Sequence, residues 1–275
     1  MRLIPPFPAL ILEEGGKRTL VVTDLHIGWE VTLAKQGIHI PSQASKMLET
    51  IIRVIKSSKP SSLIILGDVK HTIARAEMEE WRDVPEFLGK VSKLVGEVKI
   101  IPGNHDGNLE PLVPEGIELL PSTGVVAQES VGLIHGHAWP SQELLGCEGL
   151  IMGHMHPVVA FKDPFGFKSF RQVWVKAPCD KEKLARSFLR RLRLRGGRDP
   201  VEALESSLGL VLKLSRCLIM PSFNPLLGGQ PVNLSWGGES DYIGPLLKSG
   251  SVNLSGAEAY LLDGSFLGKV SRLQI

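Results

Sequence analysis

The chain of 275 residues is long enough for one large domain, and its hydrophobic content of 43% is ordinary for a globular protein with a buried core. A net charge of +2 is too small to indicate nucleic-acid binding without a local concentration of basic side chains. The three cysteines form no Cys-x-x-Cys pair, which excludes a zinc–thiolate knuckle and favours a reducing, cytoplasmic compartment. No apolar run approaches the ~18 residues of a membrane span, and the first residues do not resemble a signal peptide.

In chain order, the first half predicts short buried strands that alternate with helices. One helix is expected from an N-cap at Ser42 to Lys59, where Pro60 follows, and another over 77–94. Apolar, β-branched runs predict strands at 19–23, 63–66, 98–101, 132–134 and 149–152. This alternation is typical of an α/β fold whose first half is largely parallel.

After Pro157 the pattern becomes typical of antiparallel strands. Strands are expected at 158–161, 172–175, 217–220, 259–262 and 265–267. Asp263-Gly264, between the last two, is a strong hairpin signal. A basic helical insertion is expected over 181–215, with one helix up to Gly196-Gly197 and a second that begins at Asp199-Pro200.

Side chains that commonly bind metals follow all five strands of the first half. In an open α/β sheet, functional groups gather outside the carboxyl ends of the strands, so we expect these side chains at one rim. Residues i and i+2 of an extended segment point the same way, so Asp24 with His26, and His154 with His156, can each offer two ligands to one site. The side chains are Asp24 and His26, then Asp68, then Asn104, His105 and Asp106, then His135 and His137, then His154 and His156.

The chemistry of this set indicates a divalent-metal site. Carboxylate, imidazole and amide oxygen together favour Mn, Fe or Zn over Ca or Mg, and the lack of thiolates argues against structural zinc. The donors are too many for one ion, whereas a shared carboxylate holds two ions about 3.5–4 Å apart. Of the eight histidines only His39 lies away from these motifs, which argues against a set of ordinary structural histidines.

The motifs, taken as an ordered set over 19–157, resemble those of the calcineurin-like metallophosphoesterase superfamily. They are Asp-x-His at 24–26, Gly-Asp at 67–68, Gly-Asn-His-Asp at 103–106, His-Gly-His at 135–137 and Gly-His-x-His at 153–156. Two further segments look like the archaeal, ICC-like branch related to the SbcD nuclease. These are Gly-Asp-Val-Lys-His at 67–71 and Pro-Ser-Phe-Asn-Pro-Leu-Leu-Gly-Gly at 221–229.

The resemblance implies a four-layer αββα sandwich of two mixed sheets, counted as a single metallophosphoesterase domain over 1–275. The catalytic motifs lie in 19–157, and 158–275 would complete the second sheet and carry the basic insertion. The resemblance also implies two divalent metal ions as cofactors, with Mn first and Fe, Zn, Ni or Mg as alternatives.

The resemblance further implies roles for single residues. Asp24, His26 and His156 would bind one metal, Asn104, His135 and His154 the other, and Asp68 would bridge them. His105 would be the general acid for the leaving oxygen. Protein-phosphatase relatives carry Gly-Asp-x-x-Asp-Arg where this chain has Gly-Asp-Val-Lys-His at 67–71, which argues against a protein phosphatase. The acid that orients their catalytic histidine is therefore missing, and either Asp106 or a carbonyl is left to orient His105.

Several residues keep two interpretations. Asp106 either orients His105 or caps a helix, and His137 either supports a metal ligand or is a bystander. Lys70 and His71 either contact the substrate phosphate or lie in a solvated loop. The basic run 181–198 either follows a nucleic-acid backbone or forms a solvated helix face.

The function implied by the resemblance is hydrolysis of phosphodiester bonds by a hydroxide between two metals. A nuclease or DNA-repair context is favoured, with DNA as the substrate, because relatives include SbcD-type nucleases and helicase- or ligase-associated phosphoesterases. The alternative is a small-molecule phosphatase or a cyclic-nucleotide phosphodiesterase with the same site. A third hypothesis is a non-catalytic binding module, which the complete ligand set and His105 argue against.

Overall fold

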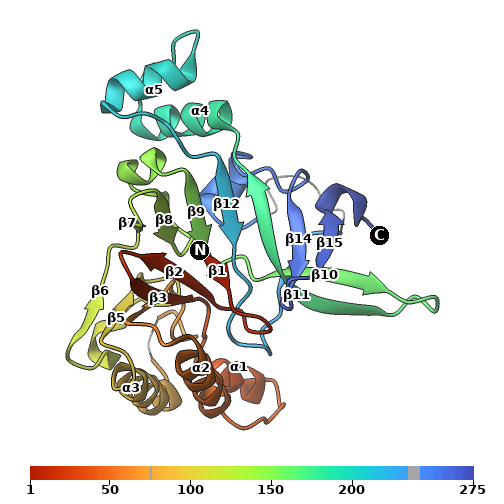
Figure 1. Ribbon diagram of the computed structural model, residues 1–275. Coiled ribbons are helices and arrows are strands. Elements are labelled where there is room, and N and C mark those ends of the chain that lie inside the picture. Colours follow the sequence, from red (N-terminus) through yellow and green to blue (C-terminus); the bar gives the residue numbers. More distant parts are fainter. Residues whose placement is uncertain (75, 235–241) are drawn as a thin grey trace. The chain divides into compact units, whose positions relative to one another are not determined.

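The structure is a computed structural model that describes residues 1–74, 76–234 and 242–275. The chain divides into two compact units, one made of Met1–Ser122 with Ser222–Leu227 and the other of Thr123–Pro221 with Gly228–Ile275. Each unit contains one mixed β-sheet with helices (Figure 1). The prediction of an α/β fold with two mixed sheets is therefore confirmed, whereas the face-to-face layering and the single domain stay predictions.

The sheet of the first unit has the strand order β1-β2-β3-β4-β5-β6, antiparallel up to β3 and parallel from β3 to β6. Its strands are β1 (Arg2–Leu3), β2 (Leu10–Glu14), β3 (Lys17–Val22), β4 (Ser62–Ile65), β5 (Glu97–Ile100) and β6 (Ile117–Leu119). The register pairs Val22 with Ile65 and Ile65 with Ile100. The parallel strands β3, β4 and β5 thus end level, and the polar segments that follow them leave the sheet at one edge.

The helices of the first unit are α1 (Trp29–Lys35), α2 (Ala44–Ser58) and α3 (Met78–Ser92). Helix α2 buries Met47, Ile51 and Val54, whose spacing of four and three residues gives one apolar face against the core. The predicted cap at Ser42 is displaced, because Gln43 occupies the N-cap position, although Ser42 Oγ still accepts from the Ala44 amide at 3.2 Å. The short helix α1 was not predicted.

The sheet of the second unit follows the path β13-β10-β11-β12-β9-β8-β7, and β14 joins it through β11 and carries β15. Its strands are β7 (Val125–Ala127), β8 (Val131–Ile134), β9 (Gly149–Met152), β10 (Pro157–Lys162), β11 (Lys168–Pro178), β12 (Arg216–Ile219), β13 (Gln230–Pro231), β14 (Glu258–Leu261) and β15 (Phe266–Lys269). Strands β8 and β9 belong to this second sheet and β3, β4 and β5 to the first, so the five strands do not form one sheet, whereas the single rim at their ends stays a prediction. Alternating strands and helices do not reveal where one sheet ends and the next begins.

The helices of the second unit carry the basic segment. They are α4 (Lys181–Leu192), α5 (Pro200–Leu208) and α6 (Pro245–Lys248), and short 3-10 helices elsewhere in the chain span Glu110–Leu112, Gln142–Gly146 and Val270–Arg272. Asp180 and Asp199 cap α4 and α5, each accepting from backbone amides of the first turn. Helix α4 ends at Leu192 rather than at Gly196, because Arg193 adopts a left-handed conformation with φ of 56°.

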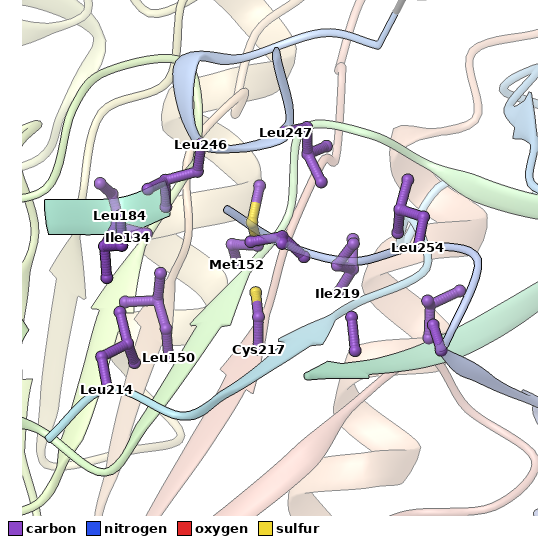
Figure 2. Packing of buried hydrophobic residues seen from close by; sticks show 14 of the residues in the cluster. Ile134, Leu150, Met152, Leu184, Leu214, Cys217, Ile219, Leu246, Leu247 and Leu254 are labelled. Atoms are coloured by element: carbon purple, nitrogen blue, oxygen red, sulfur yellow. The ribbon is translucent and has the colours of Figure 1, made fainter. Parts of the chain in front are cut away.

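The core of the second unit joins strand and helix side chains (Figure 2). Strand residues meet Leu184 of α4 and the leucines of α6, and burial raises the pKa of the Cys217 thiol well above its ordinary value. Residues labelled in Figure 2 include Ile134, Leu150, Met152, Cys217 and Ile219 from the strands and Leu246 and Leu247 from α6. No helix in 1–74, 76–234 or 242–275 is long and apolar enough to cross a membrane.

Candidate metal centre

Three proposed ligands of the first unit follow β3 and β4, where the backbone adopts a left-handed conformation. Asp24, His26 and Asp68 have φ of 55°, 43° and 52°, and their exposed fractions are 0%, 3% and 2%. The expectation of extended backbone at Asp24 and His26 was therefore wrong, and His154 and His156 also have positive φ. Of the ten non-glycine residues with positive φ in the described chain, five are proposed ligands. Such costly conformations cluster at functional sites.

Backbone hydrogen bonds fasten the loops after β3 and β4 to each other. The Asp24 amide donates to the Gly67 carbonyl at 3.1 Å, and the His26 amide donates to the Asp68 carbonyl at 2.8 Å. The side chains follow this arrangement, because His26 Nε2 lies 3.3 Å from Asp68 Oδ2. Two buried carboxylates and one buried imidazole therefore gather at the edge of the first sheet.

The loop after β5 crosses directly over Asp68. The His105 amide donates to Asp68 Oδ1 at 2.9 Å. A Cβ atom on Gly103 would lie 2.1 Å from the same Oδ1 and 2.5 Å from the Asp68 amide nitrogen, which no side chain permits. Glycine at 103 is thus required for the approach that orients Asp68.

Asp106 joins the loops after β4 and β5. Its Oδ1 accepts from the amides of Val69 and Lys70 at 2.9 and 3.3 Å, and its Oδ2 accepts from the Gly103 amide at 2.9 Å. The side chain is only 5% exposed. These bonds neither orient the ring of His105 nor cap a helix, which were the two interpretations from the sequence. They hold the backbone segments that carry Asp68 and His105.

The ring of His105 makes a short contact from Nδ1 to the backbone carbonyl of His71. A carbonyl can only accept, so the contact places a proton on Nδ1 and leaves Nε2 as the nitrogen that exchanges a proton with a ligand. Of the two candidates to orient His105, the structure thus has a carbonyl in this position. His71 stands at the chain position where protein-phosphatase relatives carry the orienting acid.

Three imidazoles of the first unit form a compact group. His71 and His105 stack with centroids 5.3 Å apart, and His26 meets the His105 ring edge-on at 4.7 Å. His26 Nδ1 and His71 Nδ1 are 3.2 Å apart, and one ring nitrogen from each of the three lies within 4.8 Å of the others. Burial lowers the pKa of His71 to about 4, and repulsion from His26 and His105 adds to this effect. A neutral His71 is suited to donate a lone pair to a cation.

Lys70 is a buried cation that braces the same loops. It is 0% exposed, and its Nζ donates to the His105 carbonyl at 2.6 Å and, over a shorter distance, to the Thr72 carbonyl. Burial lowers the pKa of Lys70, and the nearby carboxylates of Glu80, Asp106 and Asp68 oppose that effect. The solvated-loop interpretation of Lys70 was therefore wrong, whereas a substrate contact stays a prediction.

Glu80 of α3 is a positioning residue that the sequence analysis missed. Its Oε1 accepts from the amides of His71 and Thr72 at 2.9 and 2.7 Å, and its Oε2 accepts from the Glu77 amide at 2.8 Å. It is completely buried. The available signal was the Glu77-x-x-Glu80 spacing, which forms a capping box at the start of α3.

The second unit brings three other imidazoles together at the ends of β8 and β9. His135 lies 4.9 Å from His154 and 5.4 Å from His137 between ring centroids, and His137 lies 6.2 Å from His154. The Gly153 amide donates to the His135 carbonyl at 3.0 Å, which holds the two loops together. His137 thus lies within this group, while its role stays a prediction.

The segment 221–229 touches proposed ligand loops through residues that the sequence analysis did not assign. Within the first unit, Asn224 Nδ2 donates to the Leu25 carbonyl at 3.1 Å. Within the second unit, a Cβ on Gly229 would lie 2.1 Å from the His156 carbonyl, so this chain passage also requires glycine. The neighbouring Gln230 amide donates to the same carbonyl at 3.1 Å.

The donor set fits divalent ions, because buried carboxylate oxygens and imidazole nitrogens stand together in the first unit and imidazoles stand together in the second. These features define a metal-binding α/β protein. The family model described as calcineurin-like phosphoesterase matches residues 17–184, and the chain belongs to that family. Its members are metal-dependent phosphoester hydrolases that use divalent metal ions.

Comparison with other proteins adds two structural likenesses. The chain resembles the crystal structure of the Pseudomonas putida nuclease MPE, with 19% identity, a TM-score of 0.49 and coverage of 93% of this chain and 97% of that chain. It also resembles Yfce, a phosphoesterase from E. coli, with 20% identity, a TM-score of 0.33 and coverage of 53% and 73%. No curated protein matches the chain.

Proposed function

We propose that the chain is a two-metal phosphodiesterase that acts on DNA. The observation that carries this proposal is the buried set of Asp24, His26 and Asp68, with His105 fixed beside it. Burying two carboxylates in one place is costly without a compensating positive charge, and metal ions supply it. The second ligand group, His135 with His154, is a further donor set of the kind that such ions need.

Single residues receive roles in this proposal from the family motifs. Asp24, His26 and His156 would hold one ion, Asn104, His135 and His154 would hold the other, and Asp68 would be shared by both. Residues 1–275 would then act as one metallophosphoesterase domain. Mn is the first candidate, with Fe, Zn, Ni and Mg as alternatives. The segments 67–71 and 221–229 support the SbcD-related archaeal branch, and with it a nuclease or repair role and association with a helicase or ligase.

The chain's own residues would orient the substrate and move one proton. When bound, the two ions supply an activated water at neutral pH and neutralise phosphate charge. Asp68 cannot rotate freely, because Oδ1 accepts from the His105 amide and Oδ2 faces His26. His105 keeps its Nδ1 on the His71 carbonyl and gives a proton from Nε2 to the leaving oxygen.

The test measures hydrolysis of bis-p-nitrophenyl phosphate with added Mn, together with bound metal by mass spectrometry. Asp68→Ala should abolish hydrolysis and reduce bound metal, whereas Asp263→Ala, at an exposed turn, should change neither. His105→Ala should lower the rate roughly 10²–10⁴-fold with normal metal content. Loss of metal from His105→Ala would make His105 a ligand and contradict its assignment.

Substrate comparison separates the alternatives. Hydrolysis of p-nitrophenyl phosphate or of cyclic nucleotides in preference to DNA would replace the nuclease proposal with a small-molecule phosphatase or phosphodiesterase. A protein that binds metal and hydrolyses neither a diester nor a monoester would be a binding module, and the proposed function would be wrong.

A further inference from the structure

Strands β10 and β11 continue into a hairpin whose residues 161–171 are all exposed. Figure 1 shows the hairpin tip extending beyond the strands beside it. The ladder continues out to the pair Lys162 and Lys168, so the hairpin is regular structure rather than a loose loop. Because every residue of 161–171 is exposed, this part of the hairpin contributes no side chain to the hydrophobic core.

The hairpin displays four of the nine phenylalanines of the chain. Their exposed fractions are 41% for Phe161, 87% for Phe165, 75% for Phe167 and 50% for Phe170. Large aromatic side chains are normally buried, because each removes much apolar area from water. A group of them on the surface marks an interaction site.

The tip that carries Phe165 and Phe167 is ordered by its own hydrogen bonds. Asp163 Oδ1 accepts from the amides of both phenylalanines at 2.9 Å, and the Asp163 amide donates to the Phe167 carbonyl at 3.0 Å. Gly166 supplies the left-handed residue of the turn, with φ of 92°. The rings are therefore held on a rigid support, which lowers the entropy cost of binding.

Cations accompany the rings on both faces of the hairpin. Phe170 shares one face with Lys162 and Lys168, and Phe161 shares the other with Arg171, because residues paired across an antiparallel ladder lie on the same face. None of these three cations has a carboxylate partner among 1–74, 76–234 and 242–275. The hairpin thus combines aromatic rings with unneutralised positive charge.

We propose that the hairpin 161–171 binds single-stranded DNA, with the phenylalanine rings stacking on bases and the cations contacting phosphates. This combination of rings and positive charge characterises surfaces that bind single strands without sequence preference. Double-stranded DNA would satisfy the cations but not the rings, since its bases are already stacked. The choice of DNA as the partner rests on the proposed function.

The hairpin also begins at a proposed ligand loop. Strand β10 starts at Pro157, directly after His156, and Phe165 is nine residues further along the chain. An extended strand rises about 3.3 Å per residue, so the tip lies roughly 30 Å along the chain from His156. A single strand of several nucleotides lying along β10 and β11 would lead from the tip toward this loop of the second unit.

The test measures binding of a fluorescent 20-nucleotide single strand by anisotropy. All proteins carry Asp68→Asn, so that the DNA is not cut. Replacing Phe165 and Phe167 together with leucine keeps the apolar character and removes the π-faces. We expect binding to weaken by about 5- to 150-fold for each ring lost. Replacing Lys162, Lys168 and Arg171 with glutamine should reduce the slope of log affinity against log salt by about 2.

Matched controls test whether the variants fold and whether any exposed phenylalanine binds DNA nonspecifically. Phe266→Leu changes a phenylalanine of the same unit that is 58% exposed and should leave affinity unchanged. Phe165→Leu alone, at the most exposed ring, guards against misfolding of the double variant, and thermal unfolding of each variant should match the parent. An unchanged affinity of both leucine variants would overturn the proposal. So would equally tight binding of duplex DNA by the parent, or a ring-dependent dimer in light scattering without ring-dependent DNA binding.

Hydrolysis of bis-p-nitrophenyl phosphate by the chain without Asp68→Asn separates this inference from the proposed function. Hydrolysis together with a DNA affinity that does not change in the leucine variants would overturn the hairpin proposal alone. Ring-dependent DNA binding without any hydrolysis would support the hairpin proposal and overturn the proposed function.

Discussion

Replacing Lys70 with methionine tests whether a buried ammonium group holds the loops that carry Asp68 and His105. Lys70 Nζ donates to the carbonyls of His105 and Thr72. Methionine has a similar volume but no donor, so both buried acceptors would lose a partner. Each such loss costs about 1–3 kcal/mol. Part of that is offset because the desolvation penalty of the ammonium also disappears.

The net effect of Lys70→Met should be a decrease of about 2 kcal/mol in the free energy of unfolding, or roughly 4–8 °C in Tm. The activity of the folded Lys70→Met protein should also fall, because the loop that holds His105 would be displaced. The His71 carbonyl that holds His105 lies between Lys70 and Thr72, and a misplacement of about 1 Å can cost roughly 10²-fold in rate. We expect kcat for bis-p-nitrophenyl phosphate to fall about 10- to 100-fold with KM little changed.

Urea unfolding and steady-state kinetics measure these two effects. The matched control is Lys90→Met, because Lys90 is exposed on α3 and pairs only with Glu86, at 2.5 Å among the described residues. Its effect on stability should stay within about 0.5 kcal/mol. A Lys70→Met protein with the stability and kcat of the parent would refute the bracing role.

Two further substitutions probe the first unit. Gly103→Ala should lower bound metal at least tenfold by mass spectrometry, because the new Cβ would lie 2.1 Å from Asp68 Oδ1; parental metal content would show that the loop yields. Asp83→Asn should destabilise by about 1 kcal/mol at pH 7. Burial raises the pKa of Asp83, but hydrogen bonds from Arg82 and Ser42 outweigh burial and depress it. Its stabilisation is therefore complete above about pH 3.9 and is lost as the pH falls through the folded-state pKa, so the difference that urea unfolding shows at pH 7 should shrink as the pH is lowered below about 3.9.

The sequence predicted the strands and their polar ends because both are local signals. Asp24, Asp68 and Asn104 follow β3, β4 and β5 as expected, since a buried strand must be apolar whereas the loop that follows it can carry polar side chains. The membership of β8 and β9 in a second sheet was not predictable in this way. Pairing partners are chosen by packing between segments far apart in the chain, which a periodic pattern does not record.

The buried charges around the centre were equally hidden from the sequence. Lys70 and Glu80 belong to residue types that normally face water, so their default interpretation is an exposed side chain. Both are buried because backbone groups from other segments satisfy them, for example the His105 carbonyl, which is 35 residues from Lys70. Left-handed backbone at Asp24 and His26 was also unexpected, because glycine is the residue whose presence in a sequence indicates positive φ.

The missing acid of the protein-phosphatase motif shows how a backbone group can replace a side chain. In this chain His71 holds that position, and its carbonyl instead of a carboxylate contacts His105 Nδ1. A carbonyl fixes the orientation and the tautomer of the ring, as the acid would, but it adds no negative charge beside Asp68 and an anionic phosphoester. The carbonyl can serve only if the loop is rigid, and its rigidity comes from the amides held by Glu80 and the carbonyls held by Lys70. These two buried charges are therefore part of the same arrangement as His105, although neither needs to touch the substrate.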